Sequence, residues 1–250
     1  MKHLRYCLLM TGLLGLASCT KSGDPSAAPT PGVPETGYVT GHVVDAQNRP
    51  LQDAEVAVNS TGAYAPNLFA HTDANGNYRI KLPLGPQTGQ YYVRGHVRFT
   101  YENQPYNLML LTENDRPFTI DESPVRNMHL TLAGDRAQNF SDSGYFGGTL
   151  EVDNHTSNAH FPNIEVTLEP AGPLVDGSTG VTQVAKPDWM YSYNIPVGKY
   201  RVTARDKATG RALTVKNYYH DQGFQSSMLA TFEALQTGGD RYGLVIVVAD

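Results

Sequence analysis

Residues 38–58 read YVTGHVVDAQNRPLQDAEVAV. On both sides of the central polar run, apolar side chains recur at every second position, which is the period of a β-strand with one buried face. The run DAQNRP is typical of a turn, because Asp, Asn and Pro favour the backbone angles that reverse a chain. The stretch therefore predicts strands over 38–44 and 54–58, separated by the turn Asp45–Pro50.

The same alternation continues along the chain. Further alternating runs cover 78–82, 91–99 and 127–132, and Gly76 is free to adopt a positive φ in the turn before the first of them. After residue 19, residues 228–235 are the best helix candidate, and they suit a strand equally well. The composition of 15 Tyr, 24 Gly and 16 Pro in 250 residues agrees with β structure. The sequence predicts an all-β fold of antiparallel sheets.

The second half of the chain repeats the plan of the first, about 110 residues later. Residues 78–85 read YRIKLPLG and align with residues 191–198, which read YSYNIPVG. The repetition predicts two tandem β-sandwich domains, over residues 38–135 and 144–250, with a polar hinge at 134–144.

Three successive strands carry a motif that resembles the carboxypeptidase regulatory-like domain. The motif reads Gly41-x-Val43-x-Asp45, then Pro50-Leu51-x-x-Ala54-x-Val56-x-Val58, then Thr72-Asp73-x-x-Gly76-x-Tyr78-x-Ile80. The resemblance covers about residues 38–132 and implies a transthyretin-like (prealbumin-like) Greek-key β-sandwich. It also implies that the motif residues are structural. The second half lacks the Pro-Leu-x-x-Ala and Thr-Asp-x-x-Gly elements but is similar in plan.

Residues 1–18 have the features of a signal peptide. Lys2 and Arg5 precede an apolar run over 6–16 that is too short to span a bilayer as a helix. The following segment, Leu16-Ala17-Ser18-Cys19, resembles a bacterial lipobox, in which the cysteine thiol is lipidated and becomes the mature N-terminus. We therefore expect Cys19 to anchor the protein to a membrane, and Thr20 after it favours the outer membrane.

The segment after the anchor is expected to be a tether. Residues 19–37 contain four prolines and no large apolar side chain, so they form a disordered linker. Cys7 and Cys19 are the chain's two cysteines, so we expect no disulfide and no cysteine-bound metal in the domains. The net charge of −5 excludes an electrostatic basis for nucleic-acid binding.

Two families of transthyretin-like enzymes were compared with the chain. His42 lies in a strand similar to the opening strand of 5-hydroxyisourate hydrolases, but the second histidine and the Tyr-Arg-Gly-Ser-type end of that family are missing. His96-Val97-Arg98 stands where intradiol dioxygenases have His-x-His, and the arginine would repel iron. We therefore expect no enzymatic activity, no cofactor and no metal.

Two groups of side chains are candidates for a ligand surface. Alternation places Tyr92, Arg94, His96 and Arg98 on one outer strand face, where they suit an anionic glycan or a protein. An ordinary solvated face is the favoured alternative. Trp189, Tyr191 and Tyr193 share a face of another strand, either as a stacking platform for sugars or, as we favour, as core.

These observations predict a non-catalytic, lipid-anchored outer-membrane protein. It would act as a binding or scaffolding module for a protein partner or a polysaccharide. Two alternatives stay open: an accessory structural subunit of an envelope complex, and a hydrolase whose site is built on a loop such as Gly172–Gly180.

Overall fold

A computed structural model of the chain describes residues 34–62, 68–83, 89–136, 143–187, 189–220, 222–235 and 240–250. The predicted signal peptide, Cys19 and most of the predicted linker lie outside these residues. The described part contains no α-helix, only short 3-10 segments such as η1 (Ile120–Glu122) and η3 (Phe161–Asn163). None of its helices is long and apolar enough to cross a membrane. The predicted all-β fold class is confirmed.

The first domain is built from seven strands of the described residues. These are β1 (Tyr38–Val44), β2 (Glu55–Ser60), β3 (Leu68–His71), β4 (Asn77–Lys81), β5 (Tyr91–Tyr101), β6 (Gln104–Thr112) and β7 (Met128–Leu130). They hydrogen-bond in the order β3-β2-β5-β6-β7-β1-β4, and β1 and β7 run parallel. Val39 and Val43 of β1 and Val56 of β2 are buried in the same hydrophobic cluster. Strands from both halves of this order, β3-β2-β5-β6 and β7-β1-β4, therefore contribute to one core.

The second domain repeats this topology. Its strands are β8 (Gly148–Asn154), β9 (Ile164–Pro170), β10 (Gln183–Ala185), β11 (Tyr191–Ile195), β12 (Lys199–Asp206), β13 (Ala212–Asn217), β14 (Met228–Thr231), β15 (Glu233–Ala234) and β16 (Tyr242–Ala249). The order is β10-β9-β12-β13-β16-β8-β11, with β14 added on β12 and β15 on β16. Its parallel pair, β8 with β16, corresponds to β1 with β7. The repeat expected from the sequence is therefore present, and residues 228–235 form strands.

The motif residues of the first domain have structural roles. Tyr78 lies opposite Gly41 on the neighbouring strand, and its hydroxyl donates a 2.5 Å hydrogen bond to the Arg126 carbonyl. A Cβ atom at Gly41 would lie 2.6 Å from the Tyr78 ring, so only glycine fits there. In the turn after β1, the Asp45 carboxylate accepts hydrogen bonds from the backbone N–H groups of Gln47 and Arg49. Both features agree with the predicted strand–turn pattern.

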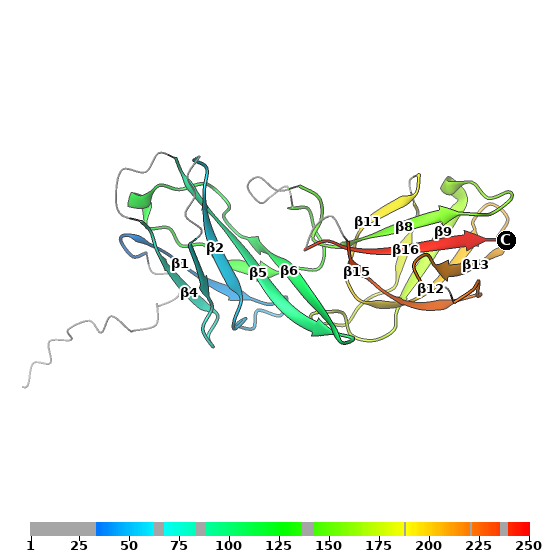
Figure 1. The fold of residues 1–250 in the computed structure, drawn as a ribbon, viewed down its shortest axis with the longest axis horizontal. Helices are drawn as coiled ribbons and strands as arrows, with labels where there is room; N and C mark the ends of the chain where they lie inside the picture. The colour runs from blue at the N-terminus through cyan, green and yellow to red at the C-terminus, as the bar shows by residue number, and fades with distance from the viewer. Residues whose placement is uncertain are drawn as a thin grey trace, which may run out of the picture.

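Aromatic side chains join the two domains. The β5–β6 hairpin reaches from the first domain to the second (Figure 1). The Tyr106 hydroxyl donates a 2.6 Å hydrogen bond to the carbonyl of Phe232, and both residues are buried. The ring centroids of Tyr106 and Tyr242 lie 4.8 Å apart, and the Tyr242 hydroxyl accepts a 2.6 Å bond from the Asn107 N–H. The domains therefore meet in a buried, hydrogen-bonded contact.

Polar contacts surround this junction. At the hairpin tip, Lys199 pairs with Glu102 at 2.6 Å, and the Tyr101 hydroxyl donates to the Pro173 carbonyl at 2.8 Å. On the connecting segment, the side chain of Arg136 is only 3% exposed and pairs with Asp240 at 2.6 Å. These contacts hold the domains together at more than one point.

Backbone hydrogen bonds join the two ends of the predicted hinge. The Arg136 N–H donates to the Gly144 carbonyl at 2.8 Å, and the Phe146 N–H donates to the Gly134 carbonyl at 2.9 Å. Residues 137–142 lie outside the described residues. The described ends of the connection are therefore hydrogen-bonded to each other as a short ladder.

The last residues of the predicted linker are also held in place. The Glu35 carboxylate accepts two hydrogen bonds from the Arg79 guanidinium, which in turn lies 3.3 Å from the centre of the Tyr38 ring. The hydrogen bond from Arg79 lowers the pKa of Glu35. Glu35, which falls within the predicted linker, is therefore held by an ion pair with Arg79 of β4.

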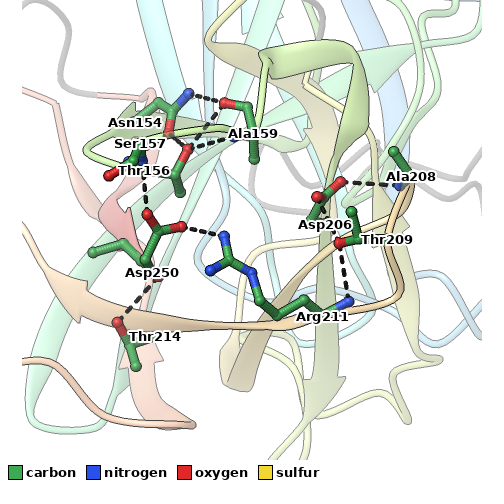
Figure 2. A network of polar contacts seen from close by, with 11 residues as sticks. Asn154, Thr156, Ser157, Ala159, Asp206, Ala208, Thr209, Arg211, Thr214 and Asp250 are labelled. Atoms are coloured by element: carbon green, nitrogen blue, oxygen red, sulfur yellow. Dashed lines mark hydrogen bonds and ion pairs between the residues drawn. The ribbon is translucent and has the colours of Figure 1, made fainter.

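A polar network ties down the C-terminal end of β16 (Figure 2). The Asp250 carboxylate accepts a 2.8 Å hydrogen bond from the Ser157 N–H and pairs with Arg211. Beside it, Asp206 accepts bonds from Thr209 and Ala208 at 2.7 and 2.9 Å. The hydrogen bond from Ser157 lowers the pKa of Asp250, and that from Thr209 lowers the pKa of Asp206. The acidic groups of this network therefore stabilise loops of the second domain.

Candidate binding surface

The predicted row on β5 lies on the outer strand face. Tyr91, Val93 and Val97 point inward and are buried, whereas Arg98 is exposed and Tyr92, Arg94 and His96 are half-buried. We call these four outward residues the β5 row. The Arg94 guanidinium lies 5.5 Å from the centre of the Tyr92 ring, and an Arg98 nitrogen lies 3.5 Å from the Glu55 carboxylate. The cations of the row are therefore engaged by their neighbours.

His96 lies close to the junction between the domains. Burial lowers its pKa, and the nearby Asp240 and Glu55 carboxylates act in the opposite direction. A hollow beside it has a volume of about 70 Å³ and is bounded by Asp53, His71 and Arg98. Ligand pockets are usually several times larger. A binding role for the β5 row stays a prediction, and the row is less open than a solvated strand face would be.

The three aromatic residues of the second domain are not core, which corrects the favoured interpretation. Trp189 is 76% exposed, Tyr193 is 55% exposed and Tyr191 is half-buried. Trp189 lies before β11 in the second domain, whereas the β5 row belongs to the first domain. The two predicted groups therefore do not share one strand or one domain.

A β-bulge explains why the core prediction failed. On β11, Tyr191 pairs with Glu151 and Ser192 with the buried Leu150, but the register then shifts, so that Ile195 pairs with Gly148. Asn194 in the bulge has a φ of 65°. A bulge shifts the alternation of faces by one residue, which turns tyrosines outward that an unbroken strand would bury. The alignment of Tyr191 with the buried Tyr78 assumed that residues 191–195 form an unbroken strand.

Tyr191 and Tyr193 form a row of stacked rings with a third tyrosine, Tyr145. The ring centroids of Tyr145 and Tyr193 lie 5.8 Å apart at an interplanar angle of 24°, and those of Tyr193 and Tyr191 lie 5.9 Å apart at 22°. We call Tyr145, Tyr193 and Tyr191 the tyrosine row. Tyr145 was not singled out from the sequence. It is held beside Asp135 by an isolated β-bridge, and no local sequence pattern predicts that contact.

Two hollows have tyrosines of the row in their lining. One has a volume of about 190 Å³, with Tyr145 and Tyr193 on its wall beside Thr149 and Arg241. The other is open, has a volume of about 400 Å³, and lies between the edge strands β10 and β11. Its lining includes Gln183, Lys186, Tyr191, Ser192, Tyr193 and Asn194. Aromatic rings and hydrogen-bonding groups are thus combined on one side of the second domain.

A second aromatic group lies after β13. Tyr218 and Tyr219 are exposed, with ring centroids 5.1 Å apart in an edge-to-face arrangement. Nearby, His220 pairs with Glu233 at 2.7 Å. The edge-to-face rings of Tyr218 and Tyr219 do not form a parallel platform, unlike the rings of the tyrosine row.

His42 and the Gly172–Gly180 loop, the positions considered for catalysis, are engaged in hydrogen bonds and packing. The His42 Nδ1 lies 3.0 Å from the Asn77 amide oxygen, and the residue is half-buried. In the Gly172–Gly180 loop, Leu174 and Val175 are buried, and the Asp176 carboxylate accepts a hydrogen bond from Ser178 at 2.6 Å. No group of three or more potential metal ligands occurs in the part of the chain that the structure describes.

Comparison with solved structures gives only distant similarity. The TIE protein of Bacillus anthracis is 13% identical over 86% of this chain and 34% of its own, with a TM-score of 0.31. A 9R-lipoxygenase from Cyanothece is 16% identical over 37% of this chain and 16% of its own, with a TM-score of 0.23. This chain thus spans about a third of the first protein and about a sixth of the second.

A third structure, the shaft pilin SpaA of Lactobacillus rhamnosus GG, is 9% identical over 86% of this chain and 98% of its own, with a TM-score of 0.25.

A match at the level of sequence families is confined to the first domain. No curated protein sequence matches the chain. Residues 38–133 match the profile of the carboxypeptidase regulatory-like domain, in agreement with the motif and with the roles of Gly41, Asp45 and Tyr78. The first domain of this chain is therefore a carboxypeptidase regulatory-like domain.

Proposed function

We propose that the protein is a non-catalytic, lipid-anchored module of the bacterial outer membrane. In this proposal it binds or scaffolds a protein partner or a polysaccharide. Cys19 carries the anchor, residues after it form the tether, and the two β-sandwiches form one rigid unit at the end of that tether. The observation that carries the proposal is the buried junction between the domains.

The junction supports this function because it fixes the orientation of the second domain. Domains of one chain generally move relative to each other unless their interface is large and apolar. Here Tyr106 and Tyr242 pack together, and Tyr106 is hydrogen-bonded to the second domain at Phe232. Buried hydrogen bonds of this kind are costly to break, since their polar groups would lose their partners. A surface on the second domain therefore keeps a constant orientation relative to the first domain.

The two alternatives make different use of the same features. An accessory structural subunit would need the rigid junction but no exposed ligand site. A hydrolase would need a site on a loop such as Gly172–Gly180, yet that loop buries Leu174 and Val175 and accepts a junction hydrogen bond at Pro173. Packing roles of this kind favour a structural loop over a catalytic one.

Anchoring can be tested in cells that carry the full chain. Metabolic labelling with a palmitate analogue and fractionation of the envelope should place the labelled protein in the outer membrane. Cys19→Ala should abolish the label and release the protein from the membrane fraction, whereas Cys7→Ala serves as the matched control and should change neither. An unlabelled wild-type protein recovered in the soluble fraction would contradict the proposal.

A further inference from the structure

We propose that the tyrosine row and the open hollow beside it bind a polysaccharide through its sugar rings. The inference deepens the proposed function by choosing between its two ligand classes. It locates the site at the side of the second domain where β10 and β11, the edge strands of the two layers, face each other.

The aromatic part of the site suits the apolar face of a sugar ring. The face of a tyrosine ring carries negative potential, and the C–H groups of a pyranose are weakly positive, so the two surfaces attract when they stack. Tyr145 and Tyr193 are 43% and 55% exposed. The three rings of the row are held within 24° of parallel for each neighbouring pair. Rigid rings of this kind lose little conformational entropy when a ligand stacks on them.

The polar part of the site suits sugar hydroxyls. The lining of the open hollow includes Gln183, Ser192, Asn194 and Lys186, all of which have polar side chains. Amides and hydroxyls can donate and accept hydrogen bonds, as sugar hydroxyls can. The volume of about 400 Å³ lies within the usual range of ligand sites. Carbohydrates combine apolar ring faces with dense hydroxyls, which is the combination this lining offers.

The backbone beside this surface is strained at Trp189 and has a positive φ at Asn194, a residue type that tolerates it. Trp189 has a φ of 62° and Asn194 a φ of 65°, so a residue in the left-handed region lies on each side of Tyr191 and Tyr193. Such conformations are uncommon for residues other than glycine, above all for a bulky one such as tryptophan. Strain of this kind occurs preferentially at ligand sites. Here the residues with positive φ, Trp189 and Asn194, lie next to or at the exposed aromatic side chains Trp189 and Tyr193.

The same bulge disfavours a peptide ligand. A peptide that adds to a sheet edge needs a regular series of unpaired backbone groups. On β11 the series is interrupted between Ser192 and Ile195, and the Asn194 side chain is already used to accept a 2.7 Å hydrogen bond from the Gly134 N–H. Bulges on edge strands generally prevent such pairing. A polysaccharide requires no backbone ladder and is therefore the better occupant.

The inference can be tested by affinity electrophoresis of the full-length lipidated protein in detergent. The gels contain laminarin, xylan, amylopectin, galactomannan or polygalacturonate, one at a time. We expect at least one polysaccharide to slow the wild-type protein. Tyr193→Ala should weaken the apparent affinity about tenfold, since a stacked aromatic contact is lost. Tyr193→Phe should retain most of the affinity, because the ring is kept.

Tyr219→Ala is the matched control, since Tyr219 is similarly exposed but lies outside the row. Equal thermal unfolding of all variants would show that each is folded. The inference is overturned if no polysaccharide slows the wild-type protein, or if Tyr219→Ala weakens binding as much as Tyr193→Ala. A protein that stays membrane-anchored through Cys19 but binds no polysaccharide would contradict this inference and leave the proposed anchoring intact.

Discussion

At the scale of single residues, the family motif is explained by close packing. Gly41 is required because the Tyr78 ring and the Arg126 carbonyl occupy the space that a side chain would need. Tyr78 is required because it fills that space and donates a hydrogen bond to Arg126. The family resemblance implied that both residues are structural, but it did not predict the close contact between Gly41 and the Tyr78 ring.

Gly41→Ala should therefore destabilise the protein. The added methyl group overlaps the Tyr78 ring, and overpacking of a core costs about 1–3 kcal/mol. Gly172→Ala is the control, because a Cβ atom at Gly172 meets no atom within 4 Å, and its effect should stay within about 0.5 kcal/mol. Urea unfolding of the two variants measures the difference. Equal stability of both would show that Gly41 is not confined.

At the scale of strands and turns, the sequence predicted those elements whose alternation is regular. The strand predicted over 38–44 coincides with β1, and those predicted over 54–58 and 91–99 differ from β2 and β5 by one or two residues at their ends. Strand β6 was missed, because Leu108, Met109 and Leu110 are all buried and leave no alternation. The bulge in β11 was missed for a related reason. A single inserted residue is invisible to a pattern of period two, although Asn194 belongs to the residue types that tolerate a positive φ.

The bulge gives a prediction for stability. Asn194→Gly keeps the positive φ but loses the hydrogen bond from Gly134, whereas Asn194→Ala loses the hydrogen bond and strains the backbone as well. The free energy of unfolding should therefore fall in the order wild type, Gly variant, Ala variant, with steps of about 1 kcal/mol. Denaturant titration measures the order. An Ala variant more stable than the Gly variant would contradict the assigned backbone conformation.

The turn after β1 gives a prediction for pH dependence. Burial of Asp45 opposes its ionisation, but hydrogen bonds from Arg49 and Gln47 outweigh this effect and lower the pKa of the carboxyl group. A lowered pKa in the folded state adds stability above the unfolded pKa of about 3.9, and this stability is lost as the pH falls below that value.

Asp45→Asn removes the titrating group of this turn. The variant should be less stable at pH 7 by about 1–2 kcal/mol, because hydrogen bonds to a charged acceptor are the stronger ones. Its disadvantage should shrink between pH 4 and pH 2, since wild-type Asp45 becomes neutral there. Unfolding curves at both ends of this range provide the measurement. A difference that stays constant over the range would exclude the assigned role of the carboxylate.

At the scale of the whole molecule, the two domains are joined by the buried contacts of Tyr106 with Phe232 and Tyr242. The sequence predicted two domains and a polar hinge between them, and it could not predict the contact between the domains. Tyr101 and Tyr106 read as ordinary strand residues, and their partners Lys199 and Phe232 lie about a hundred residues further along the chain. Contacts of that range follow from how two finished domains meet. Local periodicity carries no information about them.

The central claim is that buried contacts such as those of Tyr106 join the two sandwiches into one rigid unit. The most direct measurement is the distance distribution between two spin labels, one on each domain of the full-length lipidated protein. Phe69 and Val181 are suitable positions, because both side chains are well exposed. The account predicts a single narrow distribution for the labelled protein and a broad one after Tyr106→Ala. A broad distribution before any change at Tyr106 would contradict it.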